Sequence, residues 1–173
     1  LIVVNEADGT IKKIVDIINK QLPPNIKKIN HFMEHEGIAY LSCDFGIVQF
    51  NLSTLLFGDT YFIGNNGAEI RVNQTAFTNG FIYASSAFNG IRRANIESEN
   101  LINFSEWIEI NAGSWNGIAQ VGNELVAMNF NGNLNRFNGT NFQPFIQFPQ
   151  VAVDLRAMEN QLALTFPNQV LFY

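Results

Sequence analysis

The sequence contains a single cysteine, Cys43, among its 173 residues. One cysteine cannot form an internal disulfide, and it cannot supply the cysteine-rich motifs of structural zinc sites. The run "AYLSC" that ends with it is mostly apolar. We therefore expect a buried thiol that packs as a small hydrophobic side chain.

Charged residues are also scarce, at 14% of the chain, and the formal net charge is −5. Nucleic-acid binding needs a basic surface to meet the phosphates, and the sequence has no cluster of Lys and Arg. We therefore expect no nucleic-acid partner. A hydrophobic content of 47% is typical of a globular chain and not of a disordered one.

Long apolar runs and long helices are missing as well. No run approaches the ~18 apolar residues of a membrane helix, so we expect no membrane span. No basic segment precedes the opening "LIVVN", which argues against a signal peptide, and the abrupt ends suggest a piece of a longer protein. The helix-like run "IKKIVDIINKQL" (11–22) is rich in β-branched residues and follows Asp8-Gly9. It favours a strand followed by a loop over a helix.

A hairpin-like pattern occurs four times in the chain. Its copies begin at residues 38, 81, 124 and 161, and each joins two short apolar runs through a tight turn. The residues just before the copies are spaced by 43, 43 and 37 positions; they are Gly37, Gly80, Asn123 and Asn160. A period of ~40–50 residues with strands and no long helix indicates the blades of a β-propeller.

Each repeat carries four strand-like runs, which is the number of strands in a propeller blade. One repeat has them at 28–34, 38–44, 47–52 and 60–63, and the next at 70–77, 81–86, 91–96 and 107–110. Asn-Gly pairs, which tolerate the positive φ of type I′ turns, recur between the runs. A blade with two apolar faces cannot bury itself, so the copies must stack on one another.

We therefore predict an all-β fold, a partial β-propeller of about four blades with four antiparallel strands each. The expected boundaries are the end of a blade at 1–25, blades at 26–68, 69–113 and 114–150, and an incomplete blade at 151–173. The chain is then an arc of a larger propeller or a very small closed one, and its abrupt ends favour the arc. Whether 1–25 and 151–173 combine into one mixed blade stays open.

Two stretches resemble a known family. "AYLSCDFGIV" (39–48) followed by "DTYFIGNNGA" (59–68), and "IYASS" (82–86) followed by "ENLINFSEW" (99–107), are similar to the N-terminal propeller of PorZ proteins. The resemblance covers residues 1–112, and the remainder agrees by repeat pattern only. The chain departs from it at "SAFNGIRRAN", where Arg92 and Arg93 stand in place of a Gly-Leu-Tyr-like strand.

The resemblance implies a surface component of the type IX secretion system of Bacteroidetes, in which two propellers precede a C-terminal β-domain. It implies a location at the cell surface, associated with the outer membrane or periplasmic. The implied partners are other secretion-complex proteins, including a sortase-like protease, and surface lipopolysaccharide or another glycan. We expect non-enzymatic binding or scaffolding. The alternatives are a periplasmic ligand-sensing propeller of a hybrid two-component regulator and a polysaccharide hydrolase or lyase.

The run "HFMEH" at 31–35 spells the inverted zinc-protease motif, which needs both histidines on one helical face. The repeat places this run on a strand. There His31 and His35 share a face but stand ~13 Å apart, at ~3.3 Å per residue, too far to ligate one zinc ion. We therefore expect polar strand residues here and no metal site.

Other chemical signals are weaker. The loop "NFNGNLN" (129–135) has the alternating spacing of a calcium loop but contains no carboxylate, and the acids, including Asp44 and Asp59, are scattered. No G-x-S-x-G elbow is present, so we expect no catalytic residue and no cofactor. Trp107 and Trp115 are the candidates for a binding surface, because exposed Trp favours sugar or partner contacts. The alternative for each is a place in the core.

Overall fold

The structure is a computed structural model that describes residues 1–15, 27–158 and 160–173. Three complete blades occupy the middle of the chain, and in each the strands pair antiparallel in chain order. Blade I consists of β3 (Ile29–His35), β4 (Ile38–Cys43), β5 (Gly46–Asn51) and β6 (Leu56–Tyr61). Blade II consists of β7 (Val72–Thr78), β8 (Phe81–Ser86), β9 (Ile91–Asn95) and β10 (Ile108–Asn111). Blade III consists of β11 (Trp115–Val121), β12 (Glu124–Asn129), β13 (Asn133–Phe137) and β14 (Phe142–Gln147).

Two smaller sheets flank these blades. The leading hairpin pairs β1 (Ile2–Val4) with β2 (Ile11–Lys13), and the trailing sheet contains β15 (Asp154–Met158), β16 (Gln161–Phe166) and β17 (Gln169–Phe172). They are separate sheets. Two short 3-10 helices, η1 (Asn65–Gly67) and η2 (Phe104–Glu106), lie in the connections of blades I and II. No helix in the described part of the chain has the length and hydropathy to cross a membrane.

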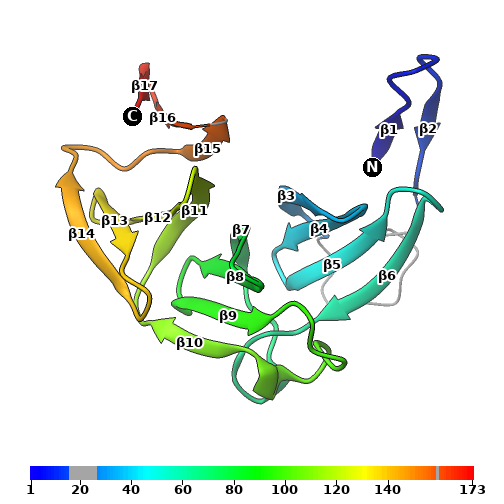
Figure 1. The fold of residues 1–173 in the computed structure, drawn as a ribbon, viewed down its shortest axis with the longest axis horizontal. Helices are drawn as coiled ribbons and strands as arrows, with labels where there is room; N and C mark the ends of the chain where they lie inside the picture. Colours follow the sequence, from blue (N-terminus) through cyan, green and yellow to red (C-terminus); the bar gives the residue numbers. More distant parts are fainter. Residues whose placement is uncertain (16–26, 159) are drawn as a thin grey trace.

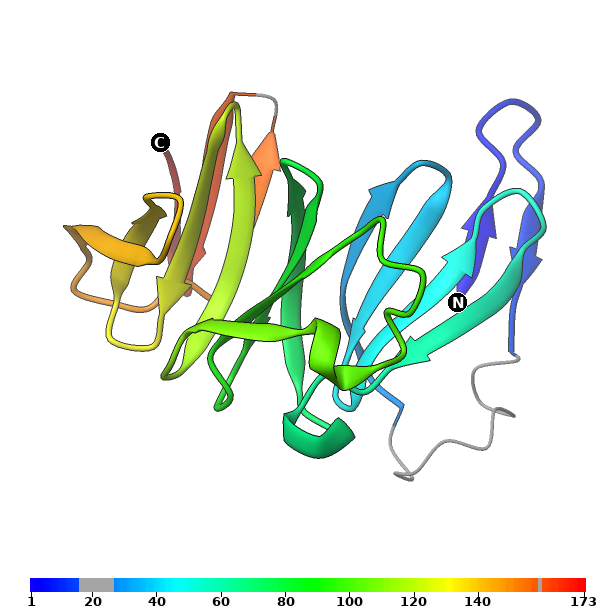
Figure 2. The ribbon, with the colours of Figure 1, turned by 60° about the horizontal axis from the view of Figure 1, so that its bottom comes forward.

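The sheets fan out around an open centre (Figure 1). The first strand of each blade lies innermost, so that β3, β7, β11 and β15 surround the axis, and the last strands β6, β10 and β14 lie at the periphery. A view turned by 60° shows the sheets as tilted layers side by side (Figure 2). The chain therefore forms an arc, with the leading hairpin at one end and the trailing sheet at the other (Figure 1).

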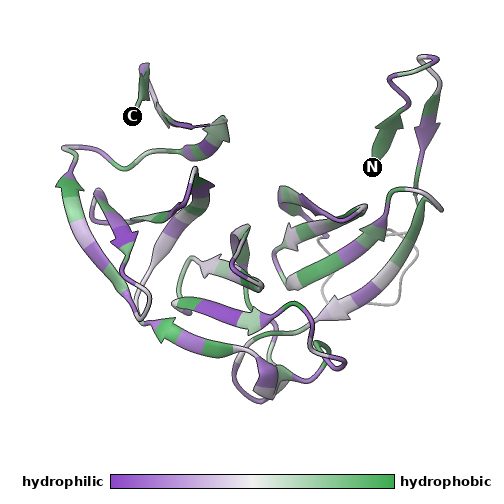
Figure 3. Ribbon diagram, viewed as in Figure 1, coloured by the Kyte–Doolittle hydropathy of each residue, from purple (hydrophilic) through white to green (hydrophobic). Residues whose placement is uncertain are grey.

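The core lies between neighbouring sheets. Tyr40 and Ile47 of blade I pack against Ile82 and Ala84 of blade II in one buried cluster. Similar clusters join blade II to blade III and blade III to the trailing sheet. Apolar and polar residues alternate along many strands (Figure 3), as expected of strands that present opposite faces to different environments. Burying one Leu or Ile side chain contributes roughly 1.5–3 kcal/mol, so these interfaces hold the arc together.

The hairpin turns follow the chemistry expected from sequence. Glu36 and Gly37 have φ of 50° and 78° in the turn between β3 and β4, and Asn79 and Gly80 have φ of 50° and 77° at the same place in blade II. Type I′ turns need positive φ at both central residues, which Gly and Asn adopt at little cost. The aligned residues that revealed the repeat therefore mark the turn after each inner strand.

The structure confirms the predicted all-β propeller with blades of four antiparallel strands. The eight strands expected in blades I and II all form, with shifted ends, the largest at β6, which was expected at 60–63. In the helix-like run, residues 11–13 form a strand, as expected, and residues 16–22 lie outside the described part of the chain. The exact blade boundaries along the sequence stay a prediction.

Candidate functional site

Three asparagines at the same place in three inner strands tie each blade to the next. Asn30, Asn73 and Asn116 each sit where the pairing register shifts by one residue, which marks a β-bulge. A bulge turns its extra residue away from the ladder. The Nδ2 of Asn30 donates to the carbonyl oxygen of Val72 at 2.9 Å, and that of Asn73 to Trp115 at 2.8 Å.

Asn116 completes the series, since its Nδ2 donates to the carbonyl oxygen of Ala152 at the start of the trailing sheet. Each acceptor is the residue directly before the equivalent position in the next blade. The fourth equivalent position is Val153, which is 61% exposed and has no side-chain amide to donate. The series of interblade hydrogen bonds, called here the asparagine clasps, therefore ends at the trailing sheet.

An axial cavity of about 380 Å³ lies among the four inner strands. Its lining includes His31 and Phe32 from β3, Phe77 from β7, Gln120 from β11 and Arg156 from β15. Apolar and polar groups contribute to it together, and half of the Phe32 surface is exposed. A concave site with apolar walls and a few polar groups is the usual form of a ligand or partner site, and a propeller places it at the axis.

His31 is the titratable group whose environment is most altered in this cavity. Its Nδ1 is buried and finds no hydrogen-bond partner among the described residues. Burial lowers the pKa of His31 to about 4; the positive charge of Arg156 adds to this effect and the negative charge of Asp154 opposes it. Arg156 itself donates from Nε to Asp154 Oδ2 at 2.7 Å. The imidazole is therefore neutral at pH 7.

A second, smaller cavity of about 200 Å³ lies at the other end of the inner strands. Its wall includes the three clasp asparagines, together with Lys28 and Arg71. Arg71 lies 3.5 Å from Asp44, which also accepts a hydrogen bond from Asn30. The lining of this cavity is mainly polar, with side-chain amides and two basic residues, so it differs in character from the larger one.

The "HFMEH" run lies in β3, the strand position that the repeat predicted. His31 lines the axial cavity, whereas His35 stacks on Phe77 with ring centroids 3.6 Å apart. No group of three or more His, Cys, Asp or Glu in the described residues is arranged to hold a metal ion. The two histidines therefore have separate environments on the same strand.

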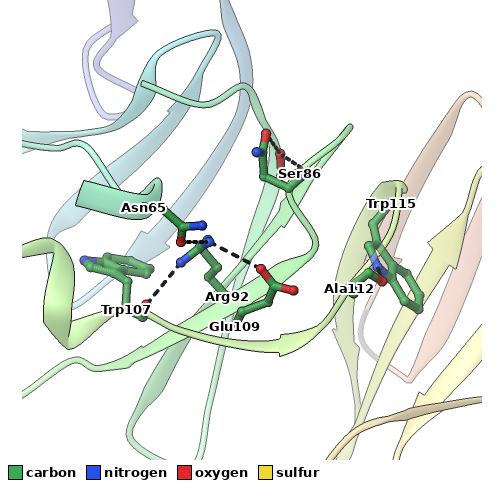
Figure 4. Close-up of polar contacts among 8 residues, drawn as sticks. Asn65, Ser86, Arg92, Trp107, Glu109, Ala112 and Trp115 are labelled. Carbon is green, nitrogen blue, oxygen red and sulfur yellow. Dashed lines mark hydrogen bonds and ion pairs between the residues drawn. The ribbon is translucent and has the colours of Figure 1, made fainter. Parts of the chain in front are cut away.

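Trp107 and Trp115, the residues named as a candidate binding surface, are both buried, with 3% and 5% of their surface exposed. Trp107 donates from Nε1 to the carbonyl oxygen of Leu101. Trp115 donates from Nε1 to the carbonyl oxygen of Ala112, which lies beside it in Figure 4. Each belongs to a core cluster between blades. Neither indole is exposed at the surface, so both tryptophans are core residues, which was the alternative for each.

Arg92, at which the sequence departs from the family pattern, has several hydrogen-bond and ion-pair partners in the structure. Its guanidinium donates to Asn65 Oδ1 at 2.7 Å and contacts Glu109 Oε2 at 3.3 Å and the Trp107 carbonyl oxygen at 3.4 Å (Figure 4). Only 5% of Arg92 is exposed. The side chain therefore joins η1 to β10 from inside blade II. Arg93, its neighbour, lies over the Phe81 ring at 4.8 Å.

Cys43 is fully buried, as expected, and burial raises the pKa of its thiol to about 12. A thiol in this state is not a nucleophile. The clasp asparagines were missed by sequence reasoning. Their spacing of 43 residues, at 30, 73 and 116, was visible, but Asn is abundant in the chain and a lone recurring Asn carries no chemistry until a bulge redirects it.

Sheets of four antiparallel strands whose first strands surround a common axis define a segment of a β-propeller. A family model described as the N-terminal β-propeller domain of PorZ, of the type IX secretion system, matches residues 2–108. The chain belongs to this family. A search of the curated proteins finds no match.

Several solved structures share the fold. PorZ of Porphyromonas gingivalis, an essential surface component of the type IX secretion system, superposes with a TM-score of 0.72 at 15% identity over 99% of this chain. The extracellular domain assigned to a hybrid two-component system of B. thetaiotaomicron superposes with a TM-score of 0.58 at 13% identity. The match covers 94% of this chain and 23% of that protein's chain. BamB of Moraxella catarrhalis superposes with a TM-score of 0.59 at 10% identity, and the match covers 84% of this chain and 43% of the BamB chain. The chain spans about a quarter of the PorZ structure, 24%.

Proposed function

We propose that this propeller is a non-enzymatic binding and scaffolding module of a type IX secretion complex at the bacterial cell surface. The observation that carries the proposal is the family match over residues 2–108. The likeness of fold to PorZ across 99% of the chain agrees with it. The partners would be other proteins of the secretion complex, with a surface glycan as a further ligand.

The geometry offers a physical basis for such a role. Apolar interfaces and the asparagine clasps make consecutive blades into one continuous body, which holds the connecting loops at fixed separations. Binding sites placed on loops by a rigid scaffold are a common arrangement. The axial cavity, with exposed Phe32 at its wall, is the concave part of that surface. Recognition would then need complementarity of shape and charge and no bond chemistry.

The proposal can be tested in a bacterium whose full-length protein contains this chain. Deleting the protein should leave secreted cargo inside the cell envelope. Cross-linking from the propeller should capture other components of the secretion complex. Phe32→Asp should weaken that capture, because it places a charge at the apolar wall of the axial cavity, whereas Gln143→Asp on the exposed outer strand β14 should not. Normal cargo secretion in the deletion strain would overturn the proposal.

A second candidate is a ligand-sensing propeller of a two-component regulator, favoured by the shared fold with the extracellular domain from B. thetaiotaomicron. In this case the axial cavity would bind a small ligand and the propeller would transmit its occupancy. The two candidates give different results in the deletion strain. Loss of the sensor would change transcription in response to a nutrient and leave cargo secretion intact.

A further inference from the structure

One position along each inner strand from the asparagine clasps, the equivalent residues form a layer around the axis. The equivalent residues of the four inner strands are His31, Gln74, Gly117 and Asp154. Gln74 of β7 is 5% exposed and reaches beyond the neighbouring blade. Its Nε2 donates to Asp154 Oδ1 at 2.7 Å and to the carbonyl oxygen of Leu155 at 3.1 Å, both in the trailing sheet.

The same side chain also holds the strand that it crosses. Gln74 Oε1 accepts a hydrogen bond from the backbone N–H of Ile118 in β11 at 3.0 Å. The amide of Gln74 therefore joins blade II to blade III and to the trailing sheet, and it makes two donated hydrogen bonds and one accepted hydrogen bond. A buried amide satisfied in this way is strongly fixed, because leaving either end unpaired would cost the desolvation of that group.

Gly117 is what allows Gln74 to pass. It is the residue of β11 in this layer, and a Cβ built there would overlap Gln74 Oε1 and lie 3.0 Å from Gln74 Cδ and 3.4 Å from Leu155 Cδ1. The backbone of Gly117 has no positive φ, so no turn requires a glycine at this position. The missing side chain instead leaves the slot that the Gln74 amide occupies.

We propose that Gln74 is an axial latch, which passes through the slot at Gly117 to hold the trailing sheet in place and to separate the two axial cavities. Residues before the layer line the smaller cavity, with Gln74 itself in its wall, and residues from the layer onward line the larger one. The latch thereby positions Leu155 and Arg156, which form one wall of the larger cavity. This inference does not depend on the proposed function.

Other contacts also attach the trailing sheet, and they make the latch testable. Leu155, Leu162 and Leu164 belong to an apolar cluster with blade III, and Asn116 donates to Ala152. The sheet should therefore stay folded when the latch alone is removed. The trailing sheet should detach more often, while blade I, to which the Gln74 amide makes no hydrogen bond, should stay unchanged.

The first experiment measures amide hydrogen exchange in the full-length protein with Gln74→Met, which keeps the length of the side chain and removes its hydrogen bonds. We expect protection in residues 152–158 to fall about tenfold, and protection in β4 and β5 to stay the same. Gln143→Met is the matched control, because the Gln143 side chain is exposed on β14 and, within the described part of the chain, donates only to Asn141 Oδ1. Unchanged protection in 152–158, or an equal fall in every sheet, would overturn the latch.

The second experiment uses the slot. Gly117→Ala should lower protection in 152–158 by a similar factor, because the new methyl displaces the Gln74 amide. In a Gln74→Ala background the same substitution should have almost no further effect, since the slot is then empty. Two substitutions that act through one contact are non-additive in this way. Additive effects of Gly117→Ala and Gln74→Ala would show that Gly117 serves another purpose and would contradict the proposal.

Discussion

At the scale of single residues, His31 makes stability depend on pH. Its pKa is lowered from the ordinary value of 6.5 to about 4, first by burial and then by Arg156. The unfolded chain binds a proton at this group between pH 6.5 and 4, and the folded chain does not. The contribution of the neutral His31 to the free energy of unfolding is therefore fully present above pH 6.5, and it is lost as the pH drops from 6.5 to 4.

We predict that the free energy of unfolding decreases by at most about 3 kcal/mol between pH 6.5 and 4 on account of His31, at about 1.4 kcal/mol per pH unit. Urea titrations at several pH values measure this slope. His31→Gln should remove it, while His35→Gln, which changes the other histidine of the chain, should leave it in place. An unaltered slope in His31→Gln would assign the dependence to the carboxylates.

Arg92 shows how a charge inside a blade differs from one at its surface. Arg92→Met should lower the free energy of unfolding by about 2 kcal/mol, because it removes the hydrogen bonds to Asn65 and the Trp107 carbonyl oxygen; Glu109 is 40% exposed and can regain water. Arg136→Met is the matched control. Arg136 pairs with Glu124 at the surface, where both side chains are nearly half exposed, so its loss should cost less than about 1 kcal/mol. Equal midpoints of urea unfolding for the two variants would contradict this account.

At the scale of strands, the repeat could be predicted because turns and apolar faces have a strong local signature. Gly37 and Gly80 identified the period, and alternation of apolar residues identified most of the strands. The bulges at the clasp asparagines left no such signature, because a bulge is set by pairing between strands and not by residue type. The contacts of Gln74 were equally invisible, since the residues that it joins lie up to 81 positions apart.

The clasps can be tested at Asn73, which is 7% exposed. Asn73→Ala removes the hydrogen bond to the Trp115 carbonyl oxygen and should cost about 1–2 kcal/mol. Asn73→Asp keeps the shape but turns a charged oxygen toward that carbonyl, so it should cost more, roughly 3 kcal/mol. Asn168→Asp, at an exposed turn, should change the free energy of unfolding by less than about 0.5 kcal/mol. If Asn73→Asp and Asn168→Asp lower the midpoint of thermal unfolding by the same amount, the clasp contributes nothing to stability.

At the scale of the whole molecule, two sheets in the described part of the chain have fewer than four strands: the leading hairpin of β1 and β2, and the trailing sheet, whose last strand is β17. All four residues of β17 are exposed, and its side chains include Val170, Leu171 and Phe172. An exposed apolar edge strand is a template for pairing with another chain. In a propeller the neighbouring strand of the same blade would cover such an edge.

The 173-residue chain on its own should therefore self-associate, and the association should pass through β17. Val170→Lys places a charge on this edge and should shift the chain toward the monomer in light scattering across a concentration series. Phe88→Lys is the control, because Phe88 is 80% exposed at a hairpin tip and lies on no sheet edge. If association came from apolar exposure in general, the two lysines would act alike. A larger effect at Val170 would instead show that unpaired backbone at the end of the arc drives association, and that another strand must cover it wherever the protein is monomeric.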